Sequence, residues 1–135
     1  LCRCNIINTV LYMKSNEAKE HGITILCNVT ESSACKLSDI DISRILLNLC
    51  DNAINAAKEC DEKQIKIDIE INDKVIKINT ENHYNPNKTK KPSPEHGNGT
   101  KIIKQIAKKY GGEYKAESTD RIYRTQTYLR NINIE

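Results

Sequence analysis

The sequence predicts a two-layer α/β sandwich of the α+β kind, in which helices cover one face of a mixed sheet. Two observations predict it. Apolar periodicity gives the element order α-β-α-β-β-loop-α-β-β, which is typical of one sheet with helices packed against it. The chain has 135 residues, a length that suits one hydrophobic core. We therefore expect residues 1–135 to form a single domain.

The first two elements follow from helical and strand periodicity. Residues 4–20 carry apolar side chains at helical spacing. Gly22 follows them at the position of a helix C-cap glycine. Residues 23–29 then alternate along the chain, which indicates a half-buried strand.

Residues 41–60 form the clearest helix, and Ser38 or Asp39 is its expected N-cap. Its apolar face is made by Ile42, Leu46, Leu49, Ala53 and Ala57. The opposite face carries Asn48, Asp51, Asn52 and Asn55. Asn is a weak helix former, so this face is either compositional drift in an Asn-rich chain or a set of oxygen atoms facing a ligand. Oxygen ligands suit Mg²⁺.

The second half of the chain is expected to form two strand hairpins, with one helix between them in the sequence. Residues 64–71 place isoleucine at every second position, and a tight turn leads to a partner strand at 75–79. Residues 80–96 have no periodicity and hold all three prolines, so we expect a long functional or disordered loop. A helix at 100–110 follows. The last two predicted elements are strands, around residues 113–118 and 122–130.

Glycine is scarce in this chain, yet four of its 5 glycines flank the helix at 100–110. Gly111 and Gly112 are expected to end the helix. Gly97 and Gly99 stand where the loop becomes the helix. Glycines there let backbone amides approach a phosphate closely, and the helix dipole favours its negative charge.

Composition narrows the function classes. The net charge of +3 is spread along the chain without a basic patch, so no nucleic-acid partner is expected, while a phosphate-bearing small ligand fits. The six cysteines form no C-x-x-C pair and indicate reduced cytosolic thiols. No apolar run approaches the ~20 residues that span a bilayer. The chain starts at Leu1 with helix-like sequence, and we expect it to be part of a longer protein.

Three motifs together resemble one family. The stretch RILLNLCDNAINAA resembles the N-box of the GHKL ATPase superfamily, with N-L-x-x-N-A at residues 48–53, as found in sensor histidine kinases. HGNG, a helix and KKYGGE resemble the second glycine box of that family, and IKIN resembles the end of its first ATP-contacting strand. Residues 49–56, LCDNAINA, are similar to the LLDNAIEA pattern of AgrC-like, peptide-sensing kinases of Gram-positive bacteria. The resemblance implies the Bergerat (histidine kinase ATPase-like) fold, with a mostly antiparallel sheet.

The resemblance also implies site residues. Asn52 corresponds to the Mg²⁺-binding asparagine, and Asn48 stands where related ATP hydrolases carry a catalytic Glu; these two are the catalytic candidates. Asn55 shares their helix face. Asn79 matches the position that reads the adenine amino group, with Asn82 as its rival, because NTENHY replaces the usual D-x-G-x-G.

Residues 80–96 correspond to the ATP lid of the family, with Lys88 as a phosphate-binding candidate. The glycine box adds five nucleotide-binding candidates: His96, Gly97, Asn98, Gly99 and Thr100. The family usually carries an apolar residue in place of Asn98 and Leu in place of Thr100.

The resemblance implies an ATP-dependent protein histidine kinase with ATP and Mg²⁺ as cofactors, acting in two-component signal transduction and quorum sensing. Residues 1–22 would lead from a missing dimerisation domain that carries the phosphoacceptor histidine. The expected partners are that domain and a response regulator. The full-length protein would be a membrane-bound bacterial homodimer with this domain in the cytoplasm, and the fragment itself would be a monomer.

Two alternatives stay open at this point. One is a degenerate, non-catalytic GHKL module that acts as a protein-interaction domain. The other is an anti-sigma-factor-type serine kinase of the same fold.

Overall fold

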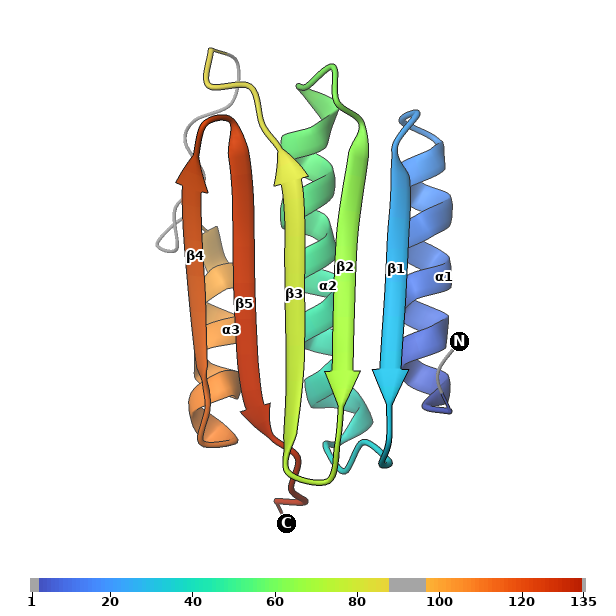
Figure 1. Cartoon of the computed structure of the whole chain (residues 1–135), viewed down its shortest axis with the longest axis vertical. Helices are drawn as coiled ribbons and strands as arrows, with labels where there is room; N and C mark the ends of the chain where they lie inside the picture. The colour runs from blue at the N-terminus through green and yellow to red at the C-terminus, as the bar shows by residue number, and fades with distance from the viewer. Residues whose placement is uncertain (1–2, 88–96, 135) are drawn as a thin grey trace.

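Three helices lie behind one sheet in the computed structural model, which describes residues 3–87 and 97–134 (Figure 1). In chain order the described elements are α1 (Asn5–Lys19), β1 (Thr24–Glu31), α2 (Asp39–Lys58), β2 (Gln64–Ile71), β3 (Val75–His83), α3 (Gly97–Lys109), β4 (Glu113–Thr119) and β5 (Ile122–Arg130). The predicted element order and the two-layer α/β sandwich are confirmed.

The sheet has five strands in the order β1-β2-β3-β5-β4. β1 and β2 pair in parallel, because α2 connects them as a crossover helix. The remaining pairs, β2–β3, β3–β5 and β4–β5, are antiparallel. The sheet is therefore mixed and mostly antiparallel, with all described helices on one face (Figure 1).

The core lies between this sheet and the helices. The four isoleucines of β2 that alternate in sequence are all buried, with at most 2% of their surface exposed. The inner face of β3 continues this layer with Ile76 and Ile78. The apolar face of α2 packs onto it, including Leu46 and Leu49. Each such side chain contributes roughly 1.5–3 kcal/mol on burial, so this layer is the main source of stability.

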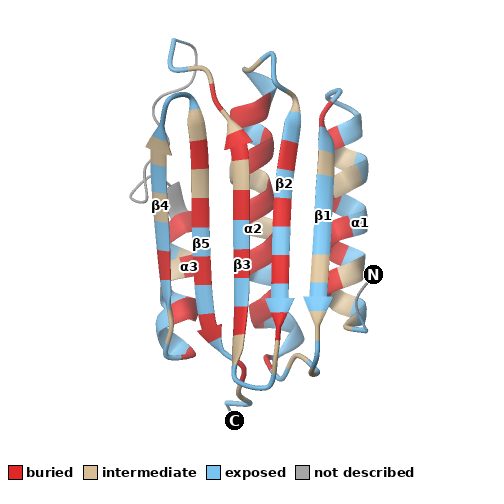
Figure 2. Cartoon of the chain, viewed as in Figure 1, coloured by how far each residue is buried: buried red, intermediate tan, exposed pale blue. Residues whose placement is uncertain are grey.

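The outer face of the sheet is exposed, as the pale blue bands of the strands in Figure 2 show, and it carries mostly polar and charged residues. One row across four strands alternates in charge. Lys66 of β2 stands opposite Glu81 of β3, which stands opposite Arg124 of β5, and Arg124 stands opposite Glu117 of β4. The Arg124 Nε donates a hydrogen bond of 2.9 Å to Glu81 Oε1. Opposite charges on neighbouring strands stabilise a solvated sheet face.

The predicted N-cap of α2 and the predicted glycines after α1 and α3 are confirmed, whereas α3 begins at Gly97, three residues before its predicted start. Ser38 is the N-cap of α2, and its hydroxyl accepts a hydrogen bond from the Asp41 backbone N–H. Gly22 and Gly111 both adopt left-handed backbone, with φ of +71° and +68°, just beyond the ends of α1 and α3. Only glycine adopts this conformation without a Cβ penalty.

Two predictions about local structure were wrong. β3 runs to His83, so residues 80–83 belong to the sheet and not to the predicted lid. Cys27 was expected on the half-buried side of β1, yet it is exposed; β1 is an edge strand of the sheet and pairs with β2 alone (Figure 1). Of the rest of the predicted lid, residues 84–87 follow β3 and residues 88–96 lie outside the described residues. Among the helices that are described, none is long and apolar enough to cross a membrane.

A buried carboxylate joins the start of α2 to the end of α3. Asp41 Oδ2 accepts hydrogen bonds from Lys109 Nζ at 2.8 Å and from the Tyr110 hydroxyl at 2.6 Å. Burial alone would raise the pKa of Asp41, but the hydrogen bonds from Lys109 and Tyr110 outweigh burial and lower it below the ordinary 3.8. Burial and the Asp41 charge raise the pKa of Tyr110.

This pKa shift gives a pH-dependent prediction. The folded pKa of Asp41 is lowered, so its stabilisation is fully present above pH 3.8 and is lost as the pH falls through the folded pKa. Asp41→Asn should lower the free energy of unfolding by about 1–3 kcal/mol at neutral pH. The difference from wild type should shrink in acid. Denaturant titrations across this pH range measure it, with Tyr110→Phe as a milder control. Equal stability of Asp41→Asn and wild type at neutral pH would contradict the assignment.

A second prediction concerns Gly112, which packs against the backbone of β5. An added Cβ would lie 1.8 Å from the Tyr128 carbonyl oxygen and 2.6 Å from its carbonyl carbon. Backbone cannot rotate away as a side chain can, so Gly112→Ala should cost roughly 3 kcal/mol or more in the free energy of unfolding. Gly111→Asn is the matched control, because Asn tolerates left-handed backbone; it should cost clearly less. A Gly112→Ala protein as stable as wild type would refute this reading.

Candidate functional site

The polar face of α2 presents three asparagines at the rim of the helix layer. Asn48 and Asn52 are one turn apart and half-buried, while Asn55 is exposed. Burial of the opposite stripe under the sheet fixes the rotation of the helix. The predicted asparagine face is therefore available to a ligand at its Asn48–Asn52 part, with Asn55 further out in solvent.

The first turn of α3 packs directly on Asn48. A Cβ at Gly99 would lie 2.7 Å from Asn48 Oδ1 and 3.3 Å from Asn48 Cγ. The Asn48 amide is fixed from the other side, since its Nδ2 donates a 2.6 Å hydrogen bond to the Arg44 carbonyl. The asparagine face and the glycine-rich turn, far apart in sequence, therefore meet in space.

Thr100 points into the core and has only 1% of its surface exposed. It shares the buried side of α3 with Ile103 and Ala107, at helical spacing. A hydroxyl thus occupies an inner position of α3. The helix begins at Gly97, and Gly97 and Asn98 lie in its first turn, where only their backbone is described. Lys88 and His96 lie outside the described residues.

Asn82 is buried on the inner face of β3, with 1% of its surface exposed. Its Nδ2 donates a 2.9 Å hydrogen bond to the His83 carbonyl. Its Oδ1 is buried without a hydrogen-bond partner. An unpaired buried acceptor costs about 1–3 kcal/mol, so such an atom is expected to meet a donor from a ligand or from water.

The surroundings of Asn82 are polar and aromatic. Tyr123 stands opposite it on β5. One row further in, Thr80 and Thr125 hydrogen-bond to each other across the same strands. Tyr84 and Tyr123 form a small buried cluster with Ala56 of α2. The inner face of the sheet therefore changes from isoleucine to hydroxyl, amide and phenol groups at this end.

Asn79 does not belong to this group. It is exposed on the outer face of β3, opposite Asp68 of β2 and Gln126 of β5. Side chains alternate between the two faces of a strand, so residues 79 and 82 cannot share a face. The structure therefore places Asn79 on the outer face and its rival, Asn82, on the side of Asn48 and Asn52.

The charges near the asparagine face are few. α3 has no acidic residue in its first turn, so its N-terminal dipole is free to favour an anion. Lys14 of α1 donates hydrogen bonds to Asp51 Oδ1 at 2.5 Å and to Glu17 Oε1 at 3.0 Å. Burial lowers the pKa of Lys14, but these two hydrogen bonds outweigh burial and raise it above its ordinary value. The sequence alone gave no signal for the partner of Asp51.

The donors at this site suit Mg²⁺ only together with a ligand that supplies oxygens. Within the described parts of the chain, no group of three or more His, Cys, Asp or Glu could hold a metal ion. Amide oxygens from Asn48 and Asn52 are too few for octahedral Mg²⁺, which takes its remaining ligands from water and phosphates. The unpaired Asn82 Oδ1 adds a place for a hydrogen-bond donor. These residues fit a magnesium–nucleotide complex better than a bare ion.

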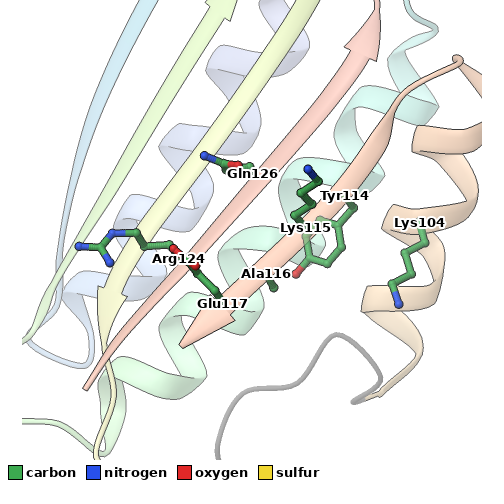
Figure 3. Close-up of a pocket in the computed structure, with 7 residues that line it drawn as sticks. All are labelled: Lys104, Tyr114, Lys115, Ala116, Glu117, Arg124 and Gln126. Carbon is green, nitrogen blue, oxygen red and sulfur yellow. The ribbon is translucent and has the colours of Figure 1, made fainter. Parts of the chain in front are cut away.

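A separate pocket of about 520 Å³ runs along the edge strand β4 (Figure 3). Lys104 of α3 and Tyr114 border it on the helix side, and Lys115 and Arg124 border it on the outer side. Arg124 is paired with Glu81, and Lys115 lies 3.4 Å from Glu113. This pocket along β4 contains none of the predicted site residues, so it is separate from the asparagine face of α2.

The Gly99–Asn48 contact generates a prediction. Gly→Ala inside a helix usually stabilises by about 0.5–1 kcal/mol. Here the new methyl group would collide with the Asn48 amide, so Gly99→Ala should be neutral or destabilising. In an Asn48→Ala background the usual gain should return. A double-mutant cycle on the free energy of unfolding should give a coupling of about 1 kcal/mol. Additive effects would show that the two residues do not touch.

Comparison with known proteins agrees with this fold. The family model described as GHKL domain matches residues 37–130. The catalytic domain of histidine kinase ThkA, in a nucleotide-free form, superposes with a TM-score of 0.67 at 17% identity, covering 96% of this chain and 94% of that chain. The mycobacterial sensor histidine kinase MprB gives 0.60 at 14% identity, with 96% of each chain covered.

A histidine kinase from Burkholderia phymatum gives a TM-score of 0.65 at 10% identity, covering 93% of this chain and 68% of that chain. No curated protein has a significantly similar sequence. At these identities the solved structures show a shared fold, the histidine kinase ATPase-like fold. The family model spans well over half of the sequence, and it includes α2, the sheet from β2 onward and α3. The chain therefore belongs to the GHKL domain family.

Proposed function

We propose that this domain binds Mg-ATP and serves as the catalytic domain of a two-component sensor histidine kinase. In the whole protein it would transfer the γ-phosphoryl group to a histidine on a separate dimerisation domain. The observation that carries the proposal is the buried Asn82 Oδ1 without a partner, on the same side of the sheet as Asn48, Asn52 and the start of α3.

Asn82 is the proposed base-reading residue. Its Nδ2 is engaged by the His83 carbonyl, which leaves the acceptor Oδ1 for a ligand. An acceptor at this position selects a base with an exocyclic amino group, such as adenine, over one with a carbonyl. The hydrogen bond lacks the charge assistance that a carboxylate would give. This proposal replaces Asn79, which lies on the other face of the sheet.

The phosphates would lie between α2 and the first turn of α3. Gly99 has no Cβ, so the backbone amides at the start of α3 can be approached closely. Asn52, together with Asn48, would hold Mg²⁺ through amide oxygens, and Asn55, Gly97, Asn98 and Thr100 complete the proposed nucleotide-binding set. Bound Mg²⁺ bridges phosphate oxygens and neutralises their charge. Lys88 is a further proposed phosphate-binding residue and His96 a further proposed nucleotide-binding residue, and both lie outside the described residues.

The amide side chain of Asn48 favours phosphoryl transfer over ATP hydrolysis. An amide cannot take a proton from water, so it cannot serve as the general base for ATP hydrolysis. Catalysis would rest on positioning the nucleotide and neutralising its charge. This favours transfer to a protein acceptor over hydrolysis, which is why a kinase is proposed and not an ATPase.

The wider setting is part of the same proposal. Residues 1–22 would lead from the dimerisation domain, and the loop after β3, through residue 96, would form the ATP lid. The full-length protein would be a membrane-bound homodimer of the AgrC-like, peptide-sensing type, with this domain in the cytoplasm and a response regulator as the next phosphoryl acceptor. As an isolated fragment it would be a monomer.

A second candidate is a non-catalytic GHKL module that acts in protein interaction. The neutral Asn82, in place of a carboxylate, favours it. Full-length protein that binds ATP but never phosphorylates its own histidine would support this alternative.

The proposal predicts the outcome of a nucleotide titration. The 135-residue chain should bind an ATP analogue with Mg²⁺ at millimolar concentration or below. Asn82→Ala should weaken binding by about fivefold to a hundredfold, the equivalent of one lost buried hydrogen bond. Asn52→Ala should weaken binding with Mg²⁺ more than without it. Asn79→Ala is the matched control, because it changes the same residue type on the same strand but on the outer face.

Three results would count against the proposal. They are no binding at millimolar nucleotide, an Asn52→Ala variant with unchanged affinity, and an Asn79→Ala variant that loses as much affinity as Asn82→Ala. A circular dichroism spectrum and an unfolding curve for each variant exclude misfolding as the cause.

A further inference from the structure

An ion pair joins α1 to the middle of the asparagine face of α2. Lys14 is buried, with 9% of its surface exposed, and its Nζ donates to Asp51 Oδ1 at 2.5 Å. The Asp51 side chain is 48% exposed, so its carboxylate lies at the rim of the helix layer. Glu17 is a second partner of Lys14, at 3.0 Å.

Asp51 stands among the site asparagines. It precedes Asn52 directly, follows Asn48 by three residues and precedes Asn55 by four. Residues three or four apart, as Asp51 is from Asn48 and Asn55, are neighbours on a helix face, within about one 5.4 Å turn, and Asn52 lies one residue further round. A ligand held by Asn48 and Asn52 would therefore lie close to the Asp51 carboxylate.

The charge of Asp51 is of the wrong sign for such a ligand. Between Arg44 and Lys58, α2 carries one charged residue, and that residue is Asp51. The other site residues that the structure describes, the asparagines and Thr100, are neutral. An unpaired carboxylate here would repel a polyphosphate, whereas the Lys14 ammonium, which is shared between Asp51 and Glu17, offsets part of the Asp51 charge locally.

We propose that Lys14 is a positioning residue for polyphosphate binding: by holding Asp51 toward α1 and balancing its charge, it keeps the asparagine face of α2 open to a nucleoside polyphosphate. This inference rests on the proposed function, because it names the electrostatic condition under which the same site accepts its ligand. Lys14 acts through Asp51 and need not touch the ligand.

The effect should grow with the charge of the ligand. One uncompensated charge about 8 Å from a ligand that carries two net charges changes affinity by about sixfold to thirtyfold, for an effective dielectric constant of roughly 40–80. The same charge has little effect on adenosine, which has no phosphate. A structural role for the pair predicts a different pattern, since a displaced helix would weaken adenosine, ADP and ATP alike.

The test uses the 135-residue chain and two opposite ways of breaking the pair. Lys14→Met leaves the Asp51 charge unbalanced and should weaken Mg-ATP binding by about sixfold to thirtyfold, Mg-ADP binding by less and adenosine binding not at all. Asp51→Asn removes the repelling charge and should keep or tighten Mg-ATP binding. Both variants should lower the free energy of unfolding, so stability and affinity separate. Lys14→Arg should keep the wild-type affinity.

Lys109→Met is the matched control. It also removes one positive charge and breaks a helix–helix ion pair, here with Asp41 at 2.8 Å, but Asp41 lies on the first turn of α2, away from the asparagine face. It should lower stability without a loss of affinity that grows with phosphate number.

The outcomes separate the two proposals. If the wild-type chain binds no nucleotide, the proposed function fails. If it binds, and Lys14→Met and Asp51→Asn shift ATP affinity in the same direction, or adenosine loses as much as ATP, the Lys14 inference alone is overturned. If Lys14→Met does not fold, Asp51→Asn decides: wild-type or tighter ATP binding supports the inference, and weaker binding refutes it.

Discussion

The burial of one stripe of α2 under the sheet is the constraint from which the site follows. Leu46, Leu49 and their apolar neighbours occupy the groove above the isoleucines of β2 and β3, and this contact fixes both the position of the helix and its rotation. Once the rotation is fixed, Asn48 and Asn52 must lie at the rim. The asparagine face is therefore held by packing on the far side of the same helix, and no polar contact needs to orient it.

α3 is placed by contacts at its two ends. At its C-terminal end, Lys109 and Tyr110 bond to Asp41, and Gly112 lies against the backbone of β5. At its N-terminal end, Gly99 rests on Asn48. Between these ends Ile103 and Ile106 pack into the core, and the missing Cβ at Gly99 lets the first turn pass close to α2.

Periodicity predicted most of the fold, and it failed where the inner face of the sheet becomes polar. The strand from residue 64 was clear because every inner residue is isoleucine. β3 was expected to end at Asn79, because Thr80 and Asn82 look like loop residues. They are inner residues of a strand that continues, and they are polar because Thr80 bonds to Thr125 and Asn82 leaves an acceptor free. Because side chains alternate between the two faces of a strand, Asn79 and Asn82 lie on opposite faces once β3 extends to His83. The sequence alone did not indicate that the strand extends so far.

Contacts between residues that are far apart in the sequence could also not be predicted from it. Asn131 ties three segments together, since its Oδ1 accepts from the Lys36 N–H at 2.7 Å and its Nδ2 donates to the carbonyls of Ala34 and Asn72, both at 2.8 Å. In an Asn-rich chain nothing local marks this residue. The motifs around Asn52 and Gly99 could be recognised because backbone geometry imposes their pattern on the sequence, whereas side-chain partners such as Lys14 and Asp51 leave no fixed spacing.

The described part of the candidate site carries few full charges, and its carboxylate, Asp51, is paired with Lys14. Amide and hydroxyl groups, the N-terminus of α3 and a paired carboxylate together give a surface in which hydrogen-bond geometry, and not attraction between full charges, must supply the selectivity. A surface of this kind discriminates by shape and by the placement of donors and acceptors, because leaving a buried polar atom unpaired costs more than an exposed ion pair contributes. The unpaired Asn82 Oδ1 is the place where that cost is already present in the free domain, and a ligand that relieves it is favoured over one that does not.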